Sequence, residues 1–309
     1  MKMSASTNGL DIQKNYISIA QFAPEDNAVL QVAIQPLTDE DDEEIGFWGT
    51  VAQELKNLKK LFRFNSSNVV CSLSSEQAVI KAIQVENDEE DQQQILNWEF
   101  AHHLAGSMDE YACDFQEMAS GMQMEYRHYL AAAVRQEAVA RLRKTIKSVK
   151  LNPFIIDLDL FALVNVFEAN YPDRISDASV LVHAENECTR VVLTNSGSFI
   201  DYGSFEFSEE AQDETAFCSL LQRETARLLS ANTEFVPQGA VCTYLAGSLF
   251  ANQQFASAVL GKMSQSELLN PFRKITCRVE VDAEQLKTYS SQLAVSVGLA
   301  LRGDEAEEI

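Results

Sequence analysis

One order of elements, met twice along the chain, restricts the possible folds more than any other feature of this sequence. The first copy consists of three strands, a helix and a further strand, predicted over Leu10–Ile12, Tyr16–Phe22, Ala28–Ile34, Phe47–Phe64 and Asn68–Leu73. The strands are apolar or alternating runs bounded by turn residues, and the helix carries apolar residues three and four positions apart. This β-β-β-α-β order predicts an α/β fold in layers.

The same order begins again about 170 residues further along. Its members are the strands Ser179–Ala184, Thr189–Leu193 and Phe199–Phe207, the helix Glu209–Ala231 and the strand Ala240–Ala246. A turn at Gly247-Ser248 and a helix over Leu249–Leu260 follow. The side chains of the two copies do not match, so the repeat rests on element order alone. It predicts two related halves.

An insertion separates the two copies. Residues 83–152 are predicted to form an α+β subdomain with a helix around Trp98, strands over Glu110–Met118 and Gln123–Ala133 joined by a turn at Ser120-Gly121, and a helix over Gln136–Val149. Three more elements are expected: a strand over Leu151–Leu160, a helix over Phe161–Phe167 and a C-terminal helix over Leu286–Leu301. We assign residues 1–82, 153–176 and 285–302 to the first half, 177–284 to the second half and 303–309 to an acidic tail.

The charge balance excludes several classes of partner. Lys and Arg total 24 against 46 Asp and Glu, which gives a formal net charge of −22. Fifteen of the acids lie in three runs, Asp39–Glu44, Glu86–Asp91 and Asp304–Glu308. Because phosphate binding depends on clustered Lys and Arg, this balance argues against general affinity for nucleic acid or anionic lipid. No nucleic-acid partner is expected.

The helix over Gln136–Val149 departs from this acidic composition. It contains Arg141, Arg143, Lys144 and Lys147, and Glu137 is its only acid. Two interpretations stay open: a solvated helix face, or a docking surface for an acidic partner or for the inner membrane surface.

No segment predicts a transmembrane helix, because a span needs roughly 20 mostly apolar residues. The N-terminus lacks the apolar region of a signal peptide. Six widely spaced cysteines without a C-x-x-C pair indicate reduced thiols, and hence a cytoplasmic protein. The neighbouring His102 and His103 point to different faces of a helix, so no metal site is predicted.

Four segments have a recognisable pattern: residues 294–302 (AVSVGLALR) near the C-terminus, Ile156–Asn165 (IDLDLFALVN), Tyr129–Leu142 (YLAAAVRQEAVARL) and the Asn270-Pro271-Phe272 triplet. In their order and at their distances, these segments resemble the PilM family of type IV pilus assembly proteins. The resemblance covers roughly residues 8–302 and implies the fold of FtsA and the actin-like ATPases (RNase H-like), with duplicated β-β-β-α-β halves and an inserted subdomain.

The resemblance also implies a function. Members of this family are cytoplasmic scaffolds, peripheral to the inner membrane, which dock the cytoplasmic N-terminal peptide of PilN, a single-pass inner-membrane protein, and contact other cytoplasmic pilus components. Many bind ATP with Mg between the two halves. Two alternatives share the fold: an ATP-dependent sugar or small-molecule kinase, and the cytoplasmic L-type protein of a type II secretion system, which normally continues into a membrane span.

The turns that hold phosphates in this superfamily are altered here. The family's first turn reads D-I-G-x-x-S, and this chain keeps Asp11 but has Gln13 and Tyr16 at the glycine and serine positions. In the second turn His183 replaces the aspartate and Glu185 the glycine. A carboxylate at a phosphate position repels the phosphate. Nucleotide binding is therefore expected to be weak or lost, and no catalytic residue is assigned.

If ATP with Mg binds at all, the resemblance implies contacts from Asp11, Gln13, Lys14, Asn15, Thr189, Gly247 and Ser248. The alternative interpretation of Asp11 is a turn-forming residue, and that of Lys14 a solvated lysine. His183 is expected to be a strand-end histidine rather than a catalytic base. Asp157 is expected to be structural, although its position in the family faces the interdomain cleft. Cys188 lies in the altered second turn, with no base placed beside it by the sequence.

Overall fold

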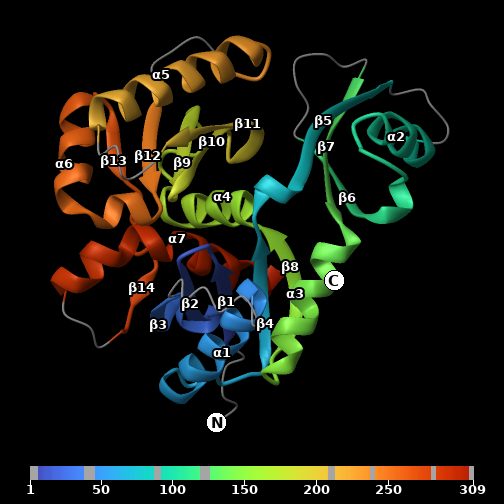
Figure 1. Ribbon diagram of the computed structural model, residues 1–309. Coiled ribbons are helices and arrows are strands. Elements are labelled where there is room, and N and C mark those ends of the chain that lie inside the picture. The colour runs from blue at the N-terminus through green and yellow to red at the C-terminus, as the bar shows by residue number, and fades with distance from the viewer. Residues whose placement is uncertain are drawn as a thin grey trace.

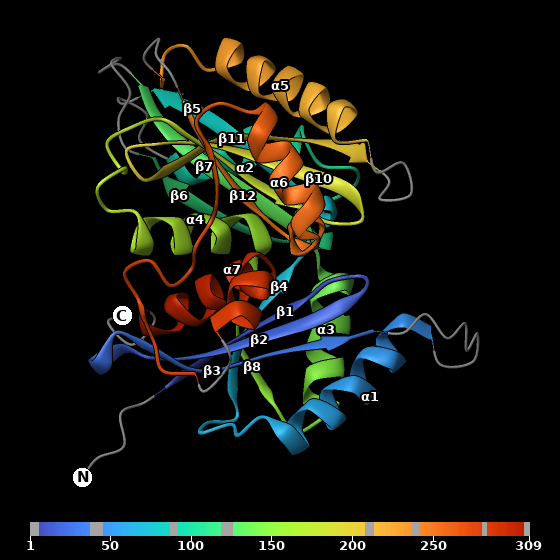
Figure 2. The ribbon, with the colours of Figure 1, turned by 90° about the vertical axis from the view of Figure 1, so that its left-hand side faces the viewer.

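The computed structural model describes residues 6–37, 46–86, 92–118, 126–207, 213–236, 241–279 and 283–305. Within them the chain forms two large sheets, stacked with helices between and around them, and a smaller third sheet at one side (Figures 1 and 2). The acidic runs at 39–44 and 87–91, the turn Ser120-Gly121 and the last residues of the acidic tail lie outside the described residues.

The first half contains a six-stranded sheet with the order β14-β3-β2-β1-β4-β8, in which β14 comes from residues that we assigned to the second half and pairs with β3. Its strands are β1 (Thr7–Ile12), β2 (Tyr16–Ala23), β3 (Ala28–Pro36), β4 (Asn68–Leu73), β8 (Asn152–Leu158) and β14 (Thr276–Cys277). β1 pairs antiparallel with β2 and parallel with β4. Helices α1 (Gly46–Leu61) and α3 (Gln136–Ser148) pack on one face of this sheet, and α7 (Ala283–Glu305) packs on the other (Figure 2).

The second half repeats this arrangement. Its five-stranded sheet has the order β11-β10-β9-β12-β13, with β9 (Ser179–Ala184), β10 (Glu187–Asn195), β11 (Ser198–Phe207), β12 (Cys242–Ala246) and β13 (Ser266–Leu268). Helices α5 (Glu214–Ala231) and α6 (Gln253–Lys262) cover its outer face (Figure 2). Phe217, Leu221 and Leu228, spaced by one and two turns on α5, are buried against this sheet, which is the pattern of an amphipathic helix.

The third sheet has the order β5-β7-β6 and is built from β5 (Ala78–Glu86), β7 (Tyr126–Arg135) and β6 (Tyr111–Glu117). Helix α2 (Gln92–Ala101) packs on it, and Ile83, Phe100 and Tyr129 belong to a hydrophobic cluster separate from the main core. Strand β5 was not predicted. Helix α3, assigned above to the insertion, packs against α1 and β8 of the first half.

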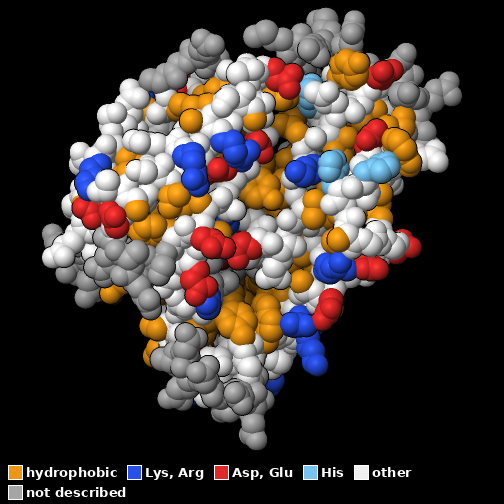
Figure 3. Space-filling view, turned by 45° about the horizontal axis from the view of Figure 1, so that its top comes forward, with side chains coloured by type: hydrophobic (Ala, Val, Ile, Leu, Met, Phe, Trp, Pro, Cys, Tyr) orange, Lys and Arg blue, Asp and Glu red, His pale blue; other side chains and the backbone are white. Residues whose placement is uncertain are grey.

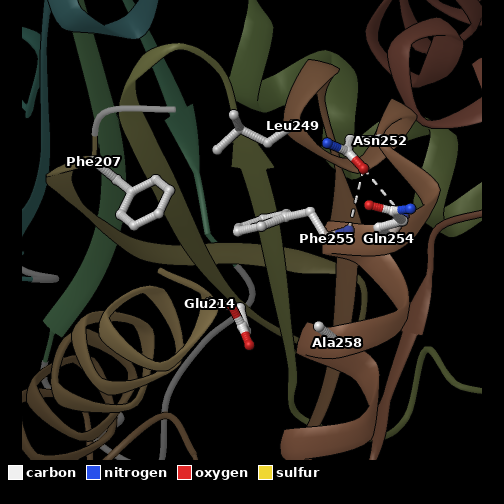
Figure 4. A pocket seen from close by; sticks show the side chains of 7 residues that line it. All are labelled: Phe207, Glu214, Leu249, Asn252, Gln254, Phe255 and Ala258. Atoms are coloured by element: carbon white, nitrogen blue, oxygen red, sulfur yellow. Dashed lines mark hydrogen bonds between the residues drawn. The ribbon is translucent and has the colours of Figure 1, made fainter. Parts of the chain in front are cut away.

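Two of the predicted helices differ from the structure for an identifiable local reason. Helix α4 (Asp159–Asn170) begins two residues early, because the Asp159 carboxylate accepts the backbone N–H groups of Ser75 at 3.0 Å and Leu160 at 2.8 Å. The helix predicted over Leu249–Leu260 is divided into a 3-10 turn (Ser248–Ala251) and α6. Asn252 caps α6 by accepting the N–H groups of Gln254 and Phe255 (Figure 4).

Helices α4 and α7 lie between the two large sheets (Figure 1) and cross with their backbones in contact. A Cβ placed on Gly298 of α7 would lie 1.9 Å from the carbonyl oxygen of Ala162 on α4. On the other side of α7, a Cβ on Gly9 of β1 would lie 2.0 Å from the carbonyl oxygen of Ser296. Glycine is therefore required at both positions, and Gly298 is the glycine of the closing GLALR motif.

We expect Gly298→Ala to lower the free energy of unfolding by about 2 kcal/mol or more, even though alanine favours helix, because the new methyl group meets backbone rather than a movable side chain. Gly261→Ala on α6 is the matched control, since nothing lies within 4 Å of a Cβ there. Chemical denaturation of both variants measures the difference. Equal stability of the two variants would contradict this account of the α4–α7 crossing.

Candidate functional site

A cleft of about 1200 Å³ lies between the two halves, beyond the end of β1. It is lined from the first half by residues 12–15, 47–48, 72–74 and 76–77, and from the second half by residues 185–188, 190 and 204–207. Four of the lining residues are glutamates: Glu76, Glu185, Glu187 and Glu206. Acidic side chains gather near the middle of the face shown in Figure 3.

The carboxylate of Asp11 is enclosed by donors of its own half. It is fully buried at the end of β1 and accepts hydrogen bonds from Ser72 Oγ at 2.7 Å and from the Gln13 side-chain amide at 2.9 and 3.1 Å. Burial raises the pKa of Asp11 to about 6, although His183 and these hydrogen bonds lower it. The Gln13 side-chain amide, which belongs to the same turn, thus donates to both oxygens of the Asp11 carboxylate.

Glu185 sits at the centre of the cleft and links its two sides. Its carboxylate accepts hydrogen bonds from the hydroxyl of Tyr16 at 2.9 Å, from Ser248 N at 3.1 Å and from Ser248 Oγ at 2.6 Å. His183 Nε2 lies 3.1 Å from the same carboxylate. Burial alone would raise the pKa of Glu185, but His183, Ser248 and Tyr16 outweigh it and hold the pKa below its usual value. Glu185 is therefore a buried, ionised and fully hydrogen-bonded group.

Two further ion pairs tie elements together around the cleft. At its rim Lys14 Nζ lies 2.7 Å from Glu187 Oε1, and both side chains are exposed. Deeper, the guanidinium of Arg190 on β10 pairs with Asp159 on α4 and also donates to Ser74 Oγ at 2.8 Å. The buried pair is the stronger constraint, because removing one partner would leave the other charged and unpaired.

The predicted turn at Gly247-Ser248 is held by close backbone contact with Ala184. Gly247 has a φ of +108°, and a Cβ there would lie 2.2 Å from the carbonyl oxygen of Ala184. Ser248, the next residue, gives both of its donors to Glu185. Thr189 is buried in β10, and its hydroxyl has no hydrogen-bond partner among the described residues. Of the predicted nucleotide contacts, Gln13, Lys14 and Asn15 line the cleft.

The residues present do not fit the triphosphate of Mg-ATP. The backbone N–H of Ser248, of the kind that cradles phosphate in a glycine-bearing turn, is already given to a carboxylate of the chain. The Asp11 carboxylate, which would organise the metal and its waters, already accepts hydrogen bonds from Gln13 and Ser72. The expectation that nucleotide binding is weak or lost stays a prediction, and the geometry shows which contacts oppose binding.

A smaller cavity of about 260 Å³ adjoins the cleft, and Phe207 lines both. Figure 4 shows the rings of Phe207 and Phe255 facing this cavity, with Asn252 and Gln254 beside them at the start of α6. Its lining comes entirely from the second half.

The structure places two further residues that the sequence singled out and adds a pair that sequence reasoning missed. Asp157, which we expected to be structural, lines a separate groove beside β6 and not the interdomain cleft that its position in the family faces. Burial, together with Glu76, raises the pKa of the Cys188 thiol to about 12, so it is a poor nucleophile. The pair Asp159 and Arg190 was missed. Asp159 lies in the apolar run Phe154–Phe167 and Arg190 directly precedes the apolar residues Val191–Leu193, and a charge in such a segment is the signal that could have suggested a buried pair.

Replacing Tyr16 by Phe removes one hydrogen bond to the Glu185 carboxylate, and we expect a loss of about 1.5–3 kcal/mol of unfolding free energy at pH 7. Because the folded-state pKa of Glu185 is depressed, its contribution is present above the unfolded pKa and disappears as the pH falls through the folded value. The deficit of the variant should therefore shrink as the pH falls below about 4.5.

Denaturant titrations at pH 7 and pH 3.5 measure this deficit. Tyr202→Phe is the control, since the Tyr202 hydroxyl makes no hydrogen bond to a described residue. A deficit of the same size at both pH values would contradict the assignment of an ionised Glu185.

The double variant Gln13→Gly/Glu185→Gly should bind Mg-ATP at least tenfold more tightly than the unmodified protein, because it frees the Ser248 N–H and removes the Gln13 amide from the Asp11 carboxylate. Isothermal titration calorimetry measures the affinity. Gln77→Gly/Glu206→Gly is the matched control, since both residues line the cleft and neither makes a described contact with Asp11 or Glu185. Micromolar binding by the unmodified protein would overturn the interpretation of these turns.

Solved structures with this fold span nearly the whole chain. A PilM-PilN type IV pilus biogenesis complex matches with a TM-score of 0.74 and 20% identity, covering 97% of this chain and 99% of the other. A Bacteroides thetaiotaomicron protein with an actin-like ATPase fold and unknown function gives 0.51 and 12%, covering 89% and 94%. An inorganic polyphosphate/ATP-glucomannokinase from Arthrobacter gives 0.51 and 13%, covering 98% and 99%. The predicted actin-like α/β fold is thereby confirmed.

No curated protein sequence matches the chain. No helix among the residues that the structure describes is long and apolar enough to cross a bilayer. A family model, described as type IV pilus assembly protein PilM, matches residues 9–200. That is more than half of the sequence, and it includes the first half apart from β14 and α7, the inserted sheet and the first strands of the second half. This chain belongs to the PilM family of type IV pilus assembly proteins.

Proposed function

We propose that this protein is a scaffold of a type IV pilus machine, which docks the cytoplasmic N-terminal peptide of a PilN-like protein at the cytoplasmic face of the inner membrane. Membership of the PilM family and the similarity to a PilM-PilN complex support this proposal. The observation that carries it is a groove along an open strand edge, beside the inserted sheet.

The groove has a volume of about 490 Å³ and lies between β6 and the first half. Five consecutive residues of β6, Ala112–Gln116, line it. Since side chains alternate between the faces of a strand, a run of consecutive lining residues means that the groove follows the edge of β6. β6 is the outer strand of the β5-β7-β6 sheet, so this edge has no partner strand among the described residues.

The groove suits an extended peptide with apolar side chains. Leu130 and Ala132 of β7 and Phe161 of α4 provide apolar surface. The charged side chains of the groove have both signs: Arg143 and Arg302 line it together with Asp114, Asp157 and Glu168. A peptide bound as an additional strand would exchange backbone hydrogen bonds with β6 and place alternate side chains against this surface. Backbone pairing supplies affinity, and the pockets supply specificity.

A scaffold role accords better with the cleft than a kinase role does. A kinase of this fold needs two turns open to phosphate and an aspartate free for a substrate hydroxyl. Here Glu185 accepts the hydrogen bond of the Ser248 N–H, and the Gln13 amide donates to the Asp11 carboxylate. We therefore propose that ATP is bound weakly or not at all, and that the protein works by holding its partner.

Ala132→Trp should reduce affinity for the partner peptide at least tenfold, because the indole would fill the groove where β7 forms its wall. The probe is a synthetic peptide with the cytoplasmic N-terminal sequence of the PilN-like protein from the same organism, followed by calorimetry. Ala140→Trp on the exposed side of α3 is the matched control. If both variants bind like the unmodified protein, the peptide lies elsewhere.

A further inference from the structure

Basic residues are concentrated in two segments of this acidic protein. Residues 56–63 and 141–150 contain nine of the chain's 24 Lys and Arg and none of its 46 Asp and Glu. We call these nine residues the basic face: Lys56, Lys59, Lys60, Arg63, Arg141, Arg143, Lys144, Lys147 and Lys150. A local excess of this size stands out against a net charge of −22.

The fold brings the two segments together. Helices α1 and α3 pack beside each other on the same face of the six-stranded sheet. Lys59 Nζ donates to the carbonyl oxygens of Val149 at 2.7 Å and Lys150 at 3.4 Å, so the ends of the two helices meet at one corner. This corner lies at the far end of the first half from the second half (Figure 1).

Few of these charges are neutralised within the protein. Among the described residues, Arg141 is the one member of the basic face with an ion pair, to Glu137 on its own helix. Elsewhere the cations are mostly paired: Lys14, Arg190, Lys262, Arg273 and Arg278 each contact a carboxylate from a distant part of the chain. The basic face therefore keeps its charge for an external anion.

The character of the face favours a bilayer over a folded acidic protein. Apart from Arg143, its residues line none of the cavities described above, so the face offers no shaped pocket. Lysines, which act as hydrated point charges without fixed bidentate geometry, suit a diffuse anionic surface. Leu61 is 83% exposed next to Lys60, and Phe154 is 47% exposed on the strand that α3 covers, so apolar groups are available for the headgroup region.

The net negative charge does not prevent such contact. Salt screens charges beyond about 8 Å at physiological ionic strength, so the residues nearest the bilayer determine the interaction. We propose that the basic face binds the anionic phospholipid headgroups of a bilayer directly. This goes beyond the proposed peptide docking, because it gives the scaffold a membrane contact of its own. The two contacts together would bind more tightly than either alone.

Sedimentation of the full chain with vesicles tests this proposal without any partner protein. Vesicles of phosphatidylcholine alone are compared with vesicles containing one quarter phosphatidylglycerol, at 50 and 500 mM NaCl. We expect binding to the anionic vesicles only, with at least a tenfold loss of the partition coefficient at high salt.

The test variant is Lys56→Glu/Lys60→Glu/Lys144→Glu, and the control is Lys81→Glu/Arg223→Glu/Lys274→Glu, which changes the net charge equally at exposed positions off the basic face. The test variant should lose at least tenfold in partition coefficient and the control should lose much less. Equal losses, or no binding of the unmodified protein to anionic vesicles, would overturn the proposal. Ala132→Trp should leave vesicle binding intact, which separates this result from failure of the peptide groove.

Discussion

Helices α4 and α7 cross at a point where α7 has no room for a side chain, and this contact places the two large sheets relative to each other. Gly298 brings α7 against the carbonyl of Ala162, and Gly9 brings β1 against the other side of α7. Because backbone meets backbone on two sides of α7, both the orientation of α7 and its distances from α4 and β1 are fixed. The six-stranded sheet, α7, α4 and the five-stranded sheet therefore form one stack, and the cleft has defined walls.

The chemistry of the cleft follows from those walls. The first turn of each half faces the other across the cleft. Side chains of the two turns therefore contact each other, and Tyr16 donates a hydrogen bond to the Glu185 carboxylate and Lys14 pairs with Glu187. Glu185 would be costly to bury alone, but Tyr16 and Ser248 surround its carboxylate with hydrogen-bond donors, and His183 Nε2 lies beside it. The turns that the resemblance to actin-like ATPases assigns to phosphate thus hold a carboxylate of the chain itself.

The repeated order of elements and the family were predicted from the sequence because they depend on local patterns: the apolar runs of β1 to β4, the helical spacing of α1 and the GLALR motif. The hydrogen bond between Tyr16 and Glu185 was not predicted, because it depends on how two turns 169 residues apart in the sequence face each other. The sequence indicated that the phosphate turns were altered, yet it could not indicate that the altered residues bind one another. Strand β5 was missed because its alternating residues fell at the predicted edge of the insertion, and the partner groove could not be assigned before the edge of β6 was placed.

The hydrogen bonds of Glu185 make its position and that of Tyr16 depend on each other. Replacing Glu185 alone would leave a buried tyrosine hydroxyl and the Ser248 donors without an acceptor, and replacing Tyr16 alone would leave the buried carboxylate with fewer donors. The two side chains therefore act as one unit in stability. Their single substitutions are not expected to have additive effects, so any redesign of this cleft has to change both positions together.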